Sequence, residues 1–124
     1  MRERITKNFH RDEFACRCGC GFDAVDSRLV DGLQKLRDIM QSIIDINSGC
    51  RCKDHNASIG GAPKSQHLLG KAADIRVDGY NPEEVADFAE VLDEFGNSGI
   101  IIYDTFTHVD VRNGKYREDK RKHT

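Results

Sequence analysis

Long apolar runs are missing from this sequence. No stretch approaches the ~20 consecutive apolar residues that a membrane-spanning helix needs, so we expect no contact with a membrane. Residues 1–14 also lack the apolar centre of a secretory signal peptide. We therefore expect a protein that is made in the cytoplasm without a signal peptide and that reaches any extracellular target by another route.

A strong charge imbalance is missing as well. The formal net charge is −2, which gives no electrostatic reason to expect a nucleic-acid partner. The length of 124 residues fits a single domain, 1–124, with one modest core, and we expect a monomer. The one basic stretch, 115–122, also contains Glu118 and Asp119. It predicts a frayed, solvated tail at about 115–124.

Internal repeats and low-complexity segments are also absent. The clearest element is an amphipathic helix from about Ser27 to Ile44, capped by Asp26 or Ser27. The further elements expected are a strand at 45–51, a turn or short helix at 53–58, a loop at 60–67, a strand at 72–77, a helix that begins at Asn81 and ends at Gly96, and strands at 99–103 and 106–112. This order favours an α+β fold, a mainly antiparallel sheet with helices on one face.

The cysteines fall into two tight groups. They are Cys16, Cys18, Cys20, Cys50 and Cys52. An odd number in a chain without a signal peptide argues against a simple disulfide framework. Clustered thiols suit a structural metal site, although the C-x-C spacing differs from the C-x2-C spacing of common zinc folds. Free thiols, a second metal site and a redox pair all stay open at this point.

Two histidines and one aspartate form the candidate catalytic metal site. His67 lies on a glycine-bounded loop, and Asp74 follows seven residues later on a strand of small residues. His108 lies on a later strand, where it shares one face with Asp110. Imidazole nitrogens and one carboxylate oxygen suit zinc and leave a fourth position for water. An ordinary loop histidine and a surface pair of Asp74 with Lys71 are the alternative interpretation.

A family resemblance favours the metal interpretation. The segment Ser65-x-His67-x-x-Gly70-x-Ala72-x-Asp74, followed by the strand His108-x-Asp110, resembles the zinc D-alanyl-D-alanine carboxypeptidases. This family includes bacterial cell-wall peptidases and phage endolysins, and it shares its fold with the hedgehog signalling domain. Ser48-Gly49-Cys50-Arg51 is similar to the family's Ser-Gly-Tyr-Arg strand, with cysteine in place of the aromatic residue. The resemblance runs from about Asn8 to Arg112, and it implies that the zinc ligands are His67, Asp74 and His108.

The general base is less well defined by the resemblance. Many family members place an acid three residues before the last ligand, but that position is Thr105 here. Asp110 shares a strand face with His108, so it is the first candidate for activating the water, and Asp104 in the preceding turn is the second. The alternative for Asp110 is to accept a hydrogen bond from a ligand histidine and fix its orientation.

Two further residues are candidates for substrate binding. The Arg51 guanidinium can grip a substrate carboxylate or stabilise an oxyanion, although an ordinary surface arginine is the alternative. Ser65 is expected to order the loop or to donate a hydrogen bond to the substrate.

The resemblance implies zinc-dependent hydrolysis of peptidoglycan stem peptides or their precursors. The enzyme would act as a carboxypeptidase at D-Ala-D-Ala or as an endopeptidase. Without a signal peptide, it would reach the cell wall after phage-type release or act on precursors in the cytoplasm. A non-catalytic metal- or wall-binding module and a phage structural component are the alternatives.

Overall fold

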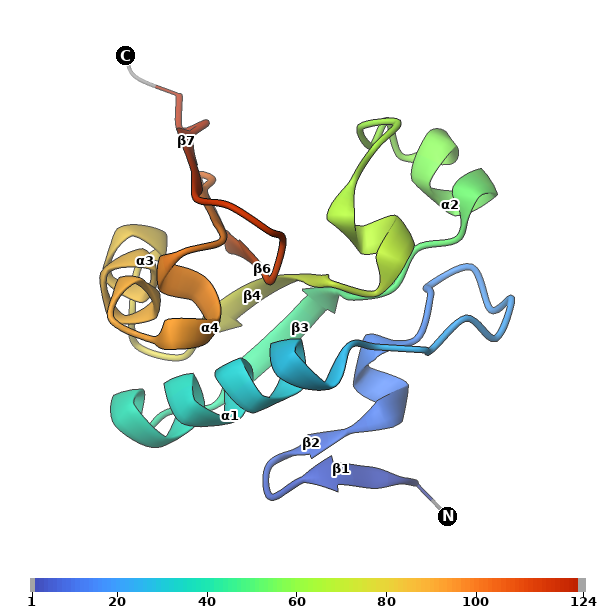
Figure 1. The fold of residues 1–124 in the computed structure, drawn as a ribbon. Helices are drawn as coiled ribbons and strands as arrows, with labels where there is room; N and C mark the ends of the chain where they lie inside the picture. Colours follow the sequence, from blue (N-terminus) through green and yellow to red (C-terminus); the bar gives the residue numbers. More distant parts are fainter. Residues whose placement is uncertain (1, 123–124) are drawn as a thin grey trace.

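A five-stranded sheet forms the centre of the computed structural model, which describes residues 2–122 (Figure 1). The helices are η1 (Arg11–Phe14), α1 (Ser27–Met40), α2 (Lys53–Ser58), η2 (Gln66–Leu69), α3 (Pro82–Glu90) and α4 (Asp93–Gly96). The strands are β1 (Arg4–Thr6), β2 (Phe9–His10), β3 (Ile44–Ser48), β4 (Ala72–Val77), β5 (Gly99–Ile102), β6 (Thr107–Asp110) and β7 (Tyr116–Asp119). The predicted α+β class is confirmed.

The strands of the large sheet follow the order β3-β4-β6-β5-β7. The first four are antiparallel to their neighbours, whereas β7 runs parallel to β5. The sheet is therefore mainly antiparallel, as the sequence predicts. A separate small hairpin of β1 and β2 lies beside α1 at the N-terminal end of the chain (Figure 1).

One face of the sheet is covered by α1, α3 and α4, and the core lies between them. Alternate residues of the strands point into this core because side chains along a strand alternate between the two faces. Ala73 and Ile75 on β4 and Val109 on β6 are fully buried there. They belong to one apolar cluster with Leu29, Leu33, Leu36, Val85, Ala89 and Phe95 of the helices. The opposite face of these strands is left for polar residues.

The first long helix begins as predicted but ends earlier. Its N-cap is Asp26, whose carboxylate accepts a hydrogen bond from the Arg28 backbone N–H at 2.8 Å. The helix ends at Met40, and Gln41 takes a left-handed conformation at φ 51°. Ile43, which the apolar periodicity assigns to the helix, is 60% exposed, so its match to the pattern is fortuitous. The chain then turns directly into β3.

The C-terminal segment corrects one prediction. Residues 116–119 were expected in a frayed tail, but they form β7 along the edge of β5. Arg117 holds this strand in place, since its guanidinium donates to the Ser98 and Gly96 carbonyls at 2.6 and 2.7 Å. Residues 123 and 124 of the predicted tail lie outside the described residues. Within residues 2–122, none of the helices has the length and apolar character needed to cross a membrane.

Candidate metal centre

One row of side chains across the sheet carries the polar residues of the site. In strand order from β3 to β7, the residues paired in this row are Ser48, Asp74, His108, Ile101 and Glu118. Residues paired directly across neighbouring strands point to the same face of a sheet. This face lies opposite the apolar core. The strand register therefore places Asp74 beside His108, although 34 positions separate them in the sequence.

His67 approaches this row from η2, the turn before β4. The backbone N–H of His67 donates to the Ser65 hydroxyl at 3.2 Å, and its carbonyl accepts a hydrogen bond from the Arg51 N–H at 3.0 Å. Gly70 ends the turn at φ 69°, a conformation that glycine adopts without strain. A Cβ at this position would overlap the Ala24 carbonyl oxygen. The turn thus fixes His67 on both sides, and the Ser65 contact fits the predicted loop-ordering role.

The three predicted zinc ligands lie together in the folded chain. His67, Asp74 and His108 are buried, with 2%, 6% and 5% of their surfaces exposed. The Asp74 Oδ1 atom lies 3.2 Å from Nε2 of His67 and 3.1 Å from Nδ1 of His108. One ligand atom from each residue lies within 4.8 Å of the other two. This spacing is compatible with a single ion bound by all three.

Each of the two imidazoles has an inner nitrogen near Asp74 and an outer nitrogen that faces away from it. The contacts of the outer nitrogens explain why a cation fits between the inner ones. Nδ1 of His67 lies 2.7 Å from the Gly49 carbonyl oxygen, and Nε2 of His108 lies 2.7 Å from Oδ2 of Asp110. Both partners can only accept, so both outer nitrogens carry protons. The inner nitrogens of neutral imidazoles then present lone pairs toward the Asp74 oxygen. Three acceptors that face one another in a buried site are satisfied by a metal ion, and this donor set suits zinc.

The contacts among these residues shift the pKa values of Asp74 and His108. Burial alone would raise the pKa of Asp74, but its hydrogen bonds with His108 and His67 outweigh burial and hold that pKa well below its usual range. The pKa of His108 is raised although burial opposes the charge, because Asp110 and Asp74 both accept hydrogen bonds from it.

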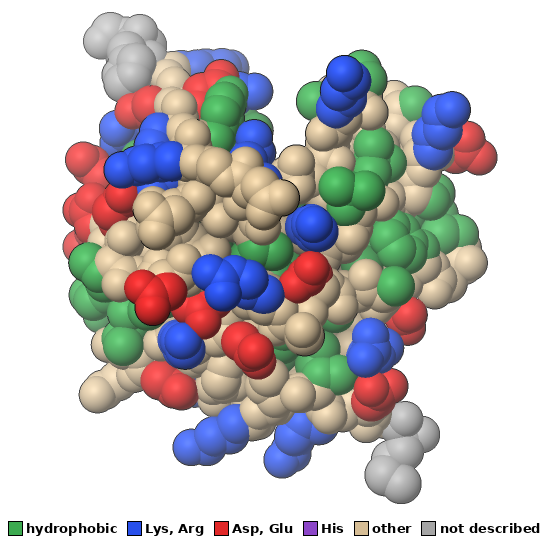
Figure 2. All heavy atoms as spheres, viewed as in Figure 1, with side chains coloured by type: hydrophobic (Ala, Val, Ile, Leu, Met, Phe, Trp, Pro, Cys, Tyr) green, Lys and Arg blue, Asp and Glu red, His purple; other side chains and the backbone are tan. Residues whose placement is uncertain are grey.

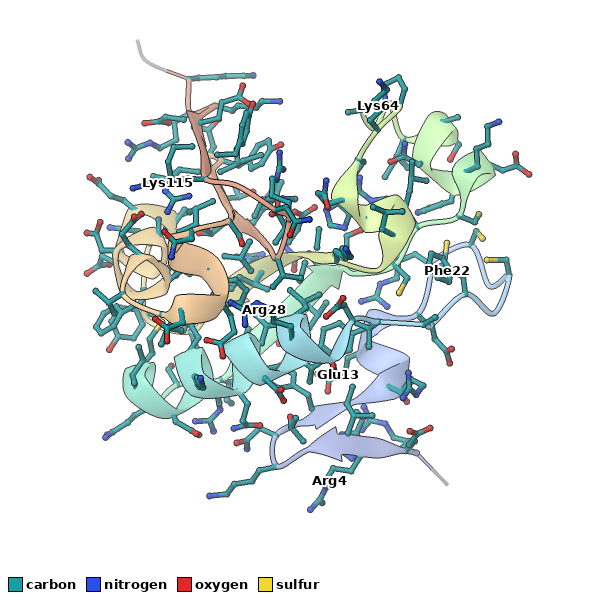
Figure 3. The ribbon with its side chains drawn as sticks, in the orientation of Figure 1. Arg4, Glu13, Phe22, Arg28, Lys64 and Lys115 are labelled. Atoms are coloured by element: carbon teal, nitrogen blue, oxygen red, sulfur yellow. The ribbon has the colours of Figure 1, made fainter. Side chains whose placement is uncertain are left out.

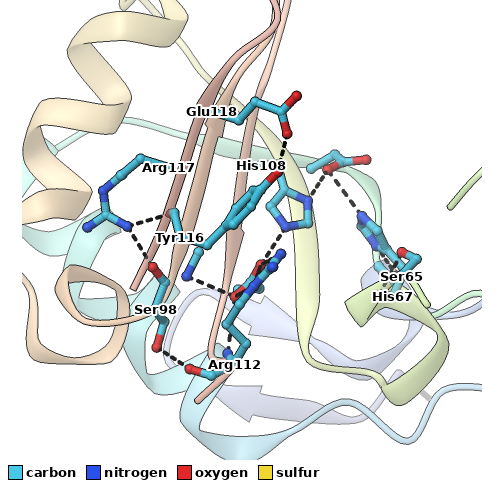
Figure 4. Close-up of polar contacts among 12 residues, drawn as sticks. Ser65, His67, Ser98, His108, Arg112, Tyr116, Arg117 and Glu118 are labelled. Atoms are coloured by element: carbon cyan, nitrogen blue, oxygen red, sulfur yellow. Dashed lines mark hydrogen bonds and ion pairs between the residues drawn. The ribbon is translucent and has the colours of Figure 1, made fainter. Parts of the chain in front are cut away.

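Asp110 is enclosed by hydrogen-bond donors and lies away from solvent. Its side chain is 0% exposed, and besides His108 it accepts hydrogen bonds from the Gly99 N–H at 2.9 Å and from the Arg112 guanidinium at 2.7 Å (Figure 4). A Cβ on Gly99 would overlap this carboxylate. These contacts fit the orienting role that the sequence left open for Asp110. Both oxygens are occupied, so neither is placed to take a proton from a substrate water.

Arg51 lies in the same site, where its guanidinium contacts Asp74, one of the three predicted metal ligands. Its guanidinium donates to Oδ2 of Asp74 at 2.9 Å, to the Ser48 hydroxyl at 3.0 Å and to the Asn56 side-chain oxygen at 3.3 Å. Because Arg51 contacts Oδ2 of Asp74, Oδ1 is the oxygen that faces His67 and His108. Arg51 therefore positions the carboxylate, and its role in binding substrate stays a prediction.

A cleft of about 330 Å³ opens onto the three ligands. One wall is the loop after α2, which carries Lys64, and the other is formed by Tyr116 and Glu118 of β7 and by Lys120 just after that strand. Figure 2 shows the molecule hollowed between these two walls, with basic side chains on both of them. Glu118 is a residue that the sequence analysis assigned to the tail. The spacing Tyr116-x-Glu118 places both residues on one face of a strand, and this pattern could have predicted β7.

Asp104, the second candidate for the general base, lies outside this cleft. It is exposed and accepts a hydrogen bond from the Lys122 backbone N–H at 3.0 Å. Together with Thr105 it lines a different hollow, beside Arg76 and Tyr80. The structure therefore does not bring Asp104 to the predicted ligands.

Comparison with known proteins gives one family match. The model of the family described as Peptidase M15 matches residues 7–110, which span β2 to the end of β6 and include all three predicted ligands. No curated protein matches the chain significantly.

Proposed function

The chain belongs to the peptidase M15 family, and from this premise we propose that it is a zinc-dependent peptidase acting on peptidoglycan stem peptides. The observation that carries the proposal is the convergence of His67, Asp74 and His108 at the floor of a cleft. Zinc held there would polarise the scissile carbonyl and make a water molecule more acidic. The open side of the cleft leaves room for that water and for the peptide.

We infer that Glu118 moves the proton in this reaction. Besides Asp74, it is the one carboxylate among the described residues that line the cleft, and it belongs to the same cross-strand row as His108. One Glu118 oxygen accepts a hydrogen bond from the Tyr116 hydroxyl (Figure 4). Glu118 would take a proton from the attacking water and deliver it to the leaving amine nitrogen. The peptide bond breaks, and the water oxygen joins the new carboxylate.

The charges around the cleft support an anionic peptide as substrate. Lys64 and Lys120 are exposed on opposite walls, and Arg51 and Arg112 lie deeper between them. Stem peptides carry several free carboxylates, and positive side chains in a cleft raise the local concentration of such ligands. The exposed lysines on the two walls thus favour a substrate that carries free carboxylates.

The experiment is digestion of purified peptidoglycan with the zinc-loaded protein, followed by mass spectrometry of the released peptides. Release of D-alanine would identify a carboxypeptidase, and new amino termini within stems or cross-links would identify an endopeptidase. His67→Ala should abolish either product. The matched control is His10→Ala, because His10 lies on β2, away from the cleft. If the zinc-loaded protein binds peptidoglycan but releases nothing, the non-catalytic binding module replaces the enzyme.

A further inference from the structure

Four of the five cysteines form a second cluster, distinct from the histidine site. The cluster consists of Cys16, Cys18, Cys20 and Cys52, whose sulfur atoms all lie within 4.8 Å of one another. The Sγ atom of Cys18 lies 3.4 Å from that of Cys16 and 3.6 Å from that of Cys52. Figure 3 shows sulfur atoms gathered between the loop near Phe22 and the start of α2. Two segments far apart in sequence thus supply one set of thiols.

The loop that carries three of these thiols has little apolar packing of its own. Cys18 and Cys20 are exposed, and only Cys16 is buried. The loop is turned back by a hydrogen bond from the Cys16 N–H to the Phe22 carbonyl at 2.8 Å. Gly19 and Gly21, on either side of Cys20, adopt φ values of 83° and 94°, which glycine reaches without strain. Ordering an exposed loop costs conformational entropy, and a cross-link would offset part of that cost.

The sulfur atoms have the spacing of ligands around one ion. Zinc–sulfur bonds of about 2.3 Å in a tetrahedron place the sulfurs roughly 3.8 Å apart, close to the separations observed. A disulfide would require about 2.05 Å between one pair. Backbone groups already point at the sulfurs: the Cys52 N–H donates to Cys16 Sγ, and the His55 N–H donates to Cys52 Sγ, both at 3.4 Å. Such N–H donors stabilise the negative charge of thiolates.

We propose that Cys16, Cys18, Cys20 and Cys52 bind a structural zinc ion as four thiolates. Binding releases the thiol protons to solvent and involves no redox change. Four protein ligands close the coordination shell, so this ion would have no open position for a substrate. Its role is to fasten the loop after η1 to the start of α2. This inference does not depend on the proposed peptidase activity.

The fifth thiol is a natural control. Cys50 is 1% exposed, does not belong to the cluster, and its backbone N–H donates to the Phe14 carbonyl at 2.8 Å. Cys50→Ala therefore removes a thiol from the chain and leaves the four ligands intact. The paired variant Cys18→Ser/Cys20→Ser removes the two exposed ligands and disturbs the core least.

Cobalt(II) distinguishes the two sites, because only thiolate ligands give a sulfur-to-cobalt charge-transfer band. The reduced protein, loaded with cobalt alone, should show this band together with the strong visible bands of a tetrahedral ion. His67→Ala and Cys50→Ala should keep the charge-transfer band, and Cys18→Ser/Cys20→Ser should lose it. The same double variant should bind one zinc ion fewer per chain. Absence of the band in the unmodified reduced protein would overturn the proposal, as would its survival in the double variant.

Alkylation of the unmodified protein tests the proposal even if the double variant fails to fold. With zinc bound, Cys18 and Cys20 should react slowly with a maleimide despite their exposure, and a chelator should restore rapid reaction. Mass spectrometry of the digested protein assigns each modified position. Equal rates with and without zinc at Cys18 and Cys20 would contradict the proposal.

Discussion

Asp110→Asn tests whether this carboxylate orients a ligand or takes a proton from water. The hydrogen-bond partners of the Asp110 carboxylate are all donors: His108 Nε2, the Gly99 N–H, and the backbone N–H and guanidinium of Arg112. An amide keeps one acceptor oxygen, but its NH2 group would face at least one of these donors without a partner. A buried polar group left unsatisfied costs about 1–3 kcal/mol, and Arg112 also loses its counter-charge. We expect the metal-free variant to lose about 2–4 kcal/mol of unfolding free energy.

The same change should weaken zinc binding because His108 loses the partner that fixes its ring. Loss of an orienting partner of a metal ligand reduces metal affinity or activity by about 10–100-fold. Zinc affinity is measured by competition with a chromophoric chelator, and unfolding of the metal-free protein by denaturant titration. The ¹⁵N shifts of His108 report its tautomer directly. Asp104→Asn is the matched control, because that aspartate is exposed and lies outside the cleft.

The outcome that would refute this reasoning is specific. If Asp110→Asn binds zinc and unfolds like the unmodified protein while its hydrolytic rate collapses, Asp110 is the general base and its hydrogen bonds to His108 are incidental. A loss of zinc affinity with an unchanged rate at saturating zinc would confirm the orienting role.

Three further predictions follow from other contacts. Glu118→Gln should retain zinc affinity but lower the rate of peptide hydrolysis by about 10²–10⁴-fold, and an unchanged rate would remove Glu118 from the mechanism. Gly99→Ala should displace the Asp110 carboxylate, because a Cβ at this position would overlap it. We expect lower zinc affinity and a loss of about 1–3 kcal/mol in unfolding free energy. Unchanged values of both quantities would contradict the contact between Gly99 and Asp110. Burial would raise the pKa of Glu94, but its hydrogen bond from Lys35 at 2.6 Å outweighs burial and lowers that pKa. The pair therefore stabilises the fold above the unfolded pKa of roughly 4.3, and this stability is lost as the pH falls through the lower folded pKa. Denaturant titrations should show that Lys35→Met is less stable than the unmodified protein by about 1 kcal/mol at neutral pH. The unfolding free energies of the two proteins should converge in acid. A difference that does not depend on pH would exclude the ion pair as the cause.

The sequence predicts the parts of the fold that have a strong local signal. Asp26 caps α1 and Asn81 caps α3 as expected, because the capping side chain and the residues it serves are neighbours in sequence. The segment 72–77 forms a strand with the predicted bounds. The end of α1 was missed because Ile43 continues the apolar period by coincidence, while its side chain is exposed.

The parts that escaped prediction depend on pairings between distant segments. The strand β7 has no apolar alternation, and it forms because β5 offers an unpaired edge and Arg117 ties it to the Gly96 and Ser98 carbonyls. The cleft wall and Glu118 were missed with it. For Asp110 the sequence left two roles open, and only the donors around its carboxylate distinguish them.

The two proposed metal sites share one short backbone segment, Gly49–Cys52. The Gly49 carbonyl accepts the His67 Nδ1 proton, and the Arg51 N–H donates to the His67 carbonyl. On either side of Arg51, the Cys50 N–H donates to the Phe14 carbonyl and the Cys52 N–H to Cys16 Sγ. Successive residues thus bond alternately to η1 or the thiol-carrying loop after it and to the turn that carries His67. Because His67 must hold its ring against the Gly49 carbonyl to present Nε2 to the cleft, the thiolate cluster fixes one end of the segment on which that geometry depends. A small chain with a modest core can in this way hold a catalytic ligand by a cross-link outside the core.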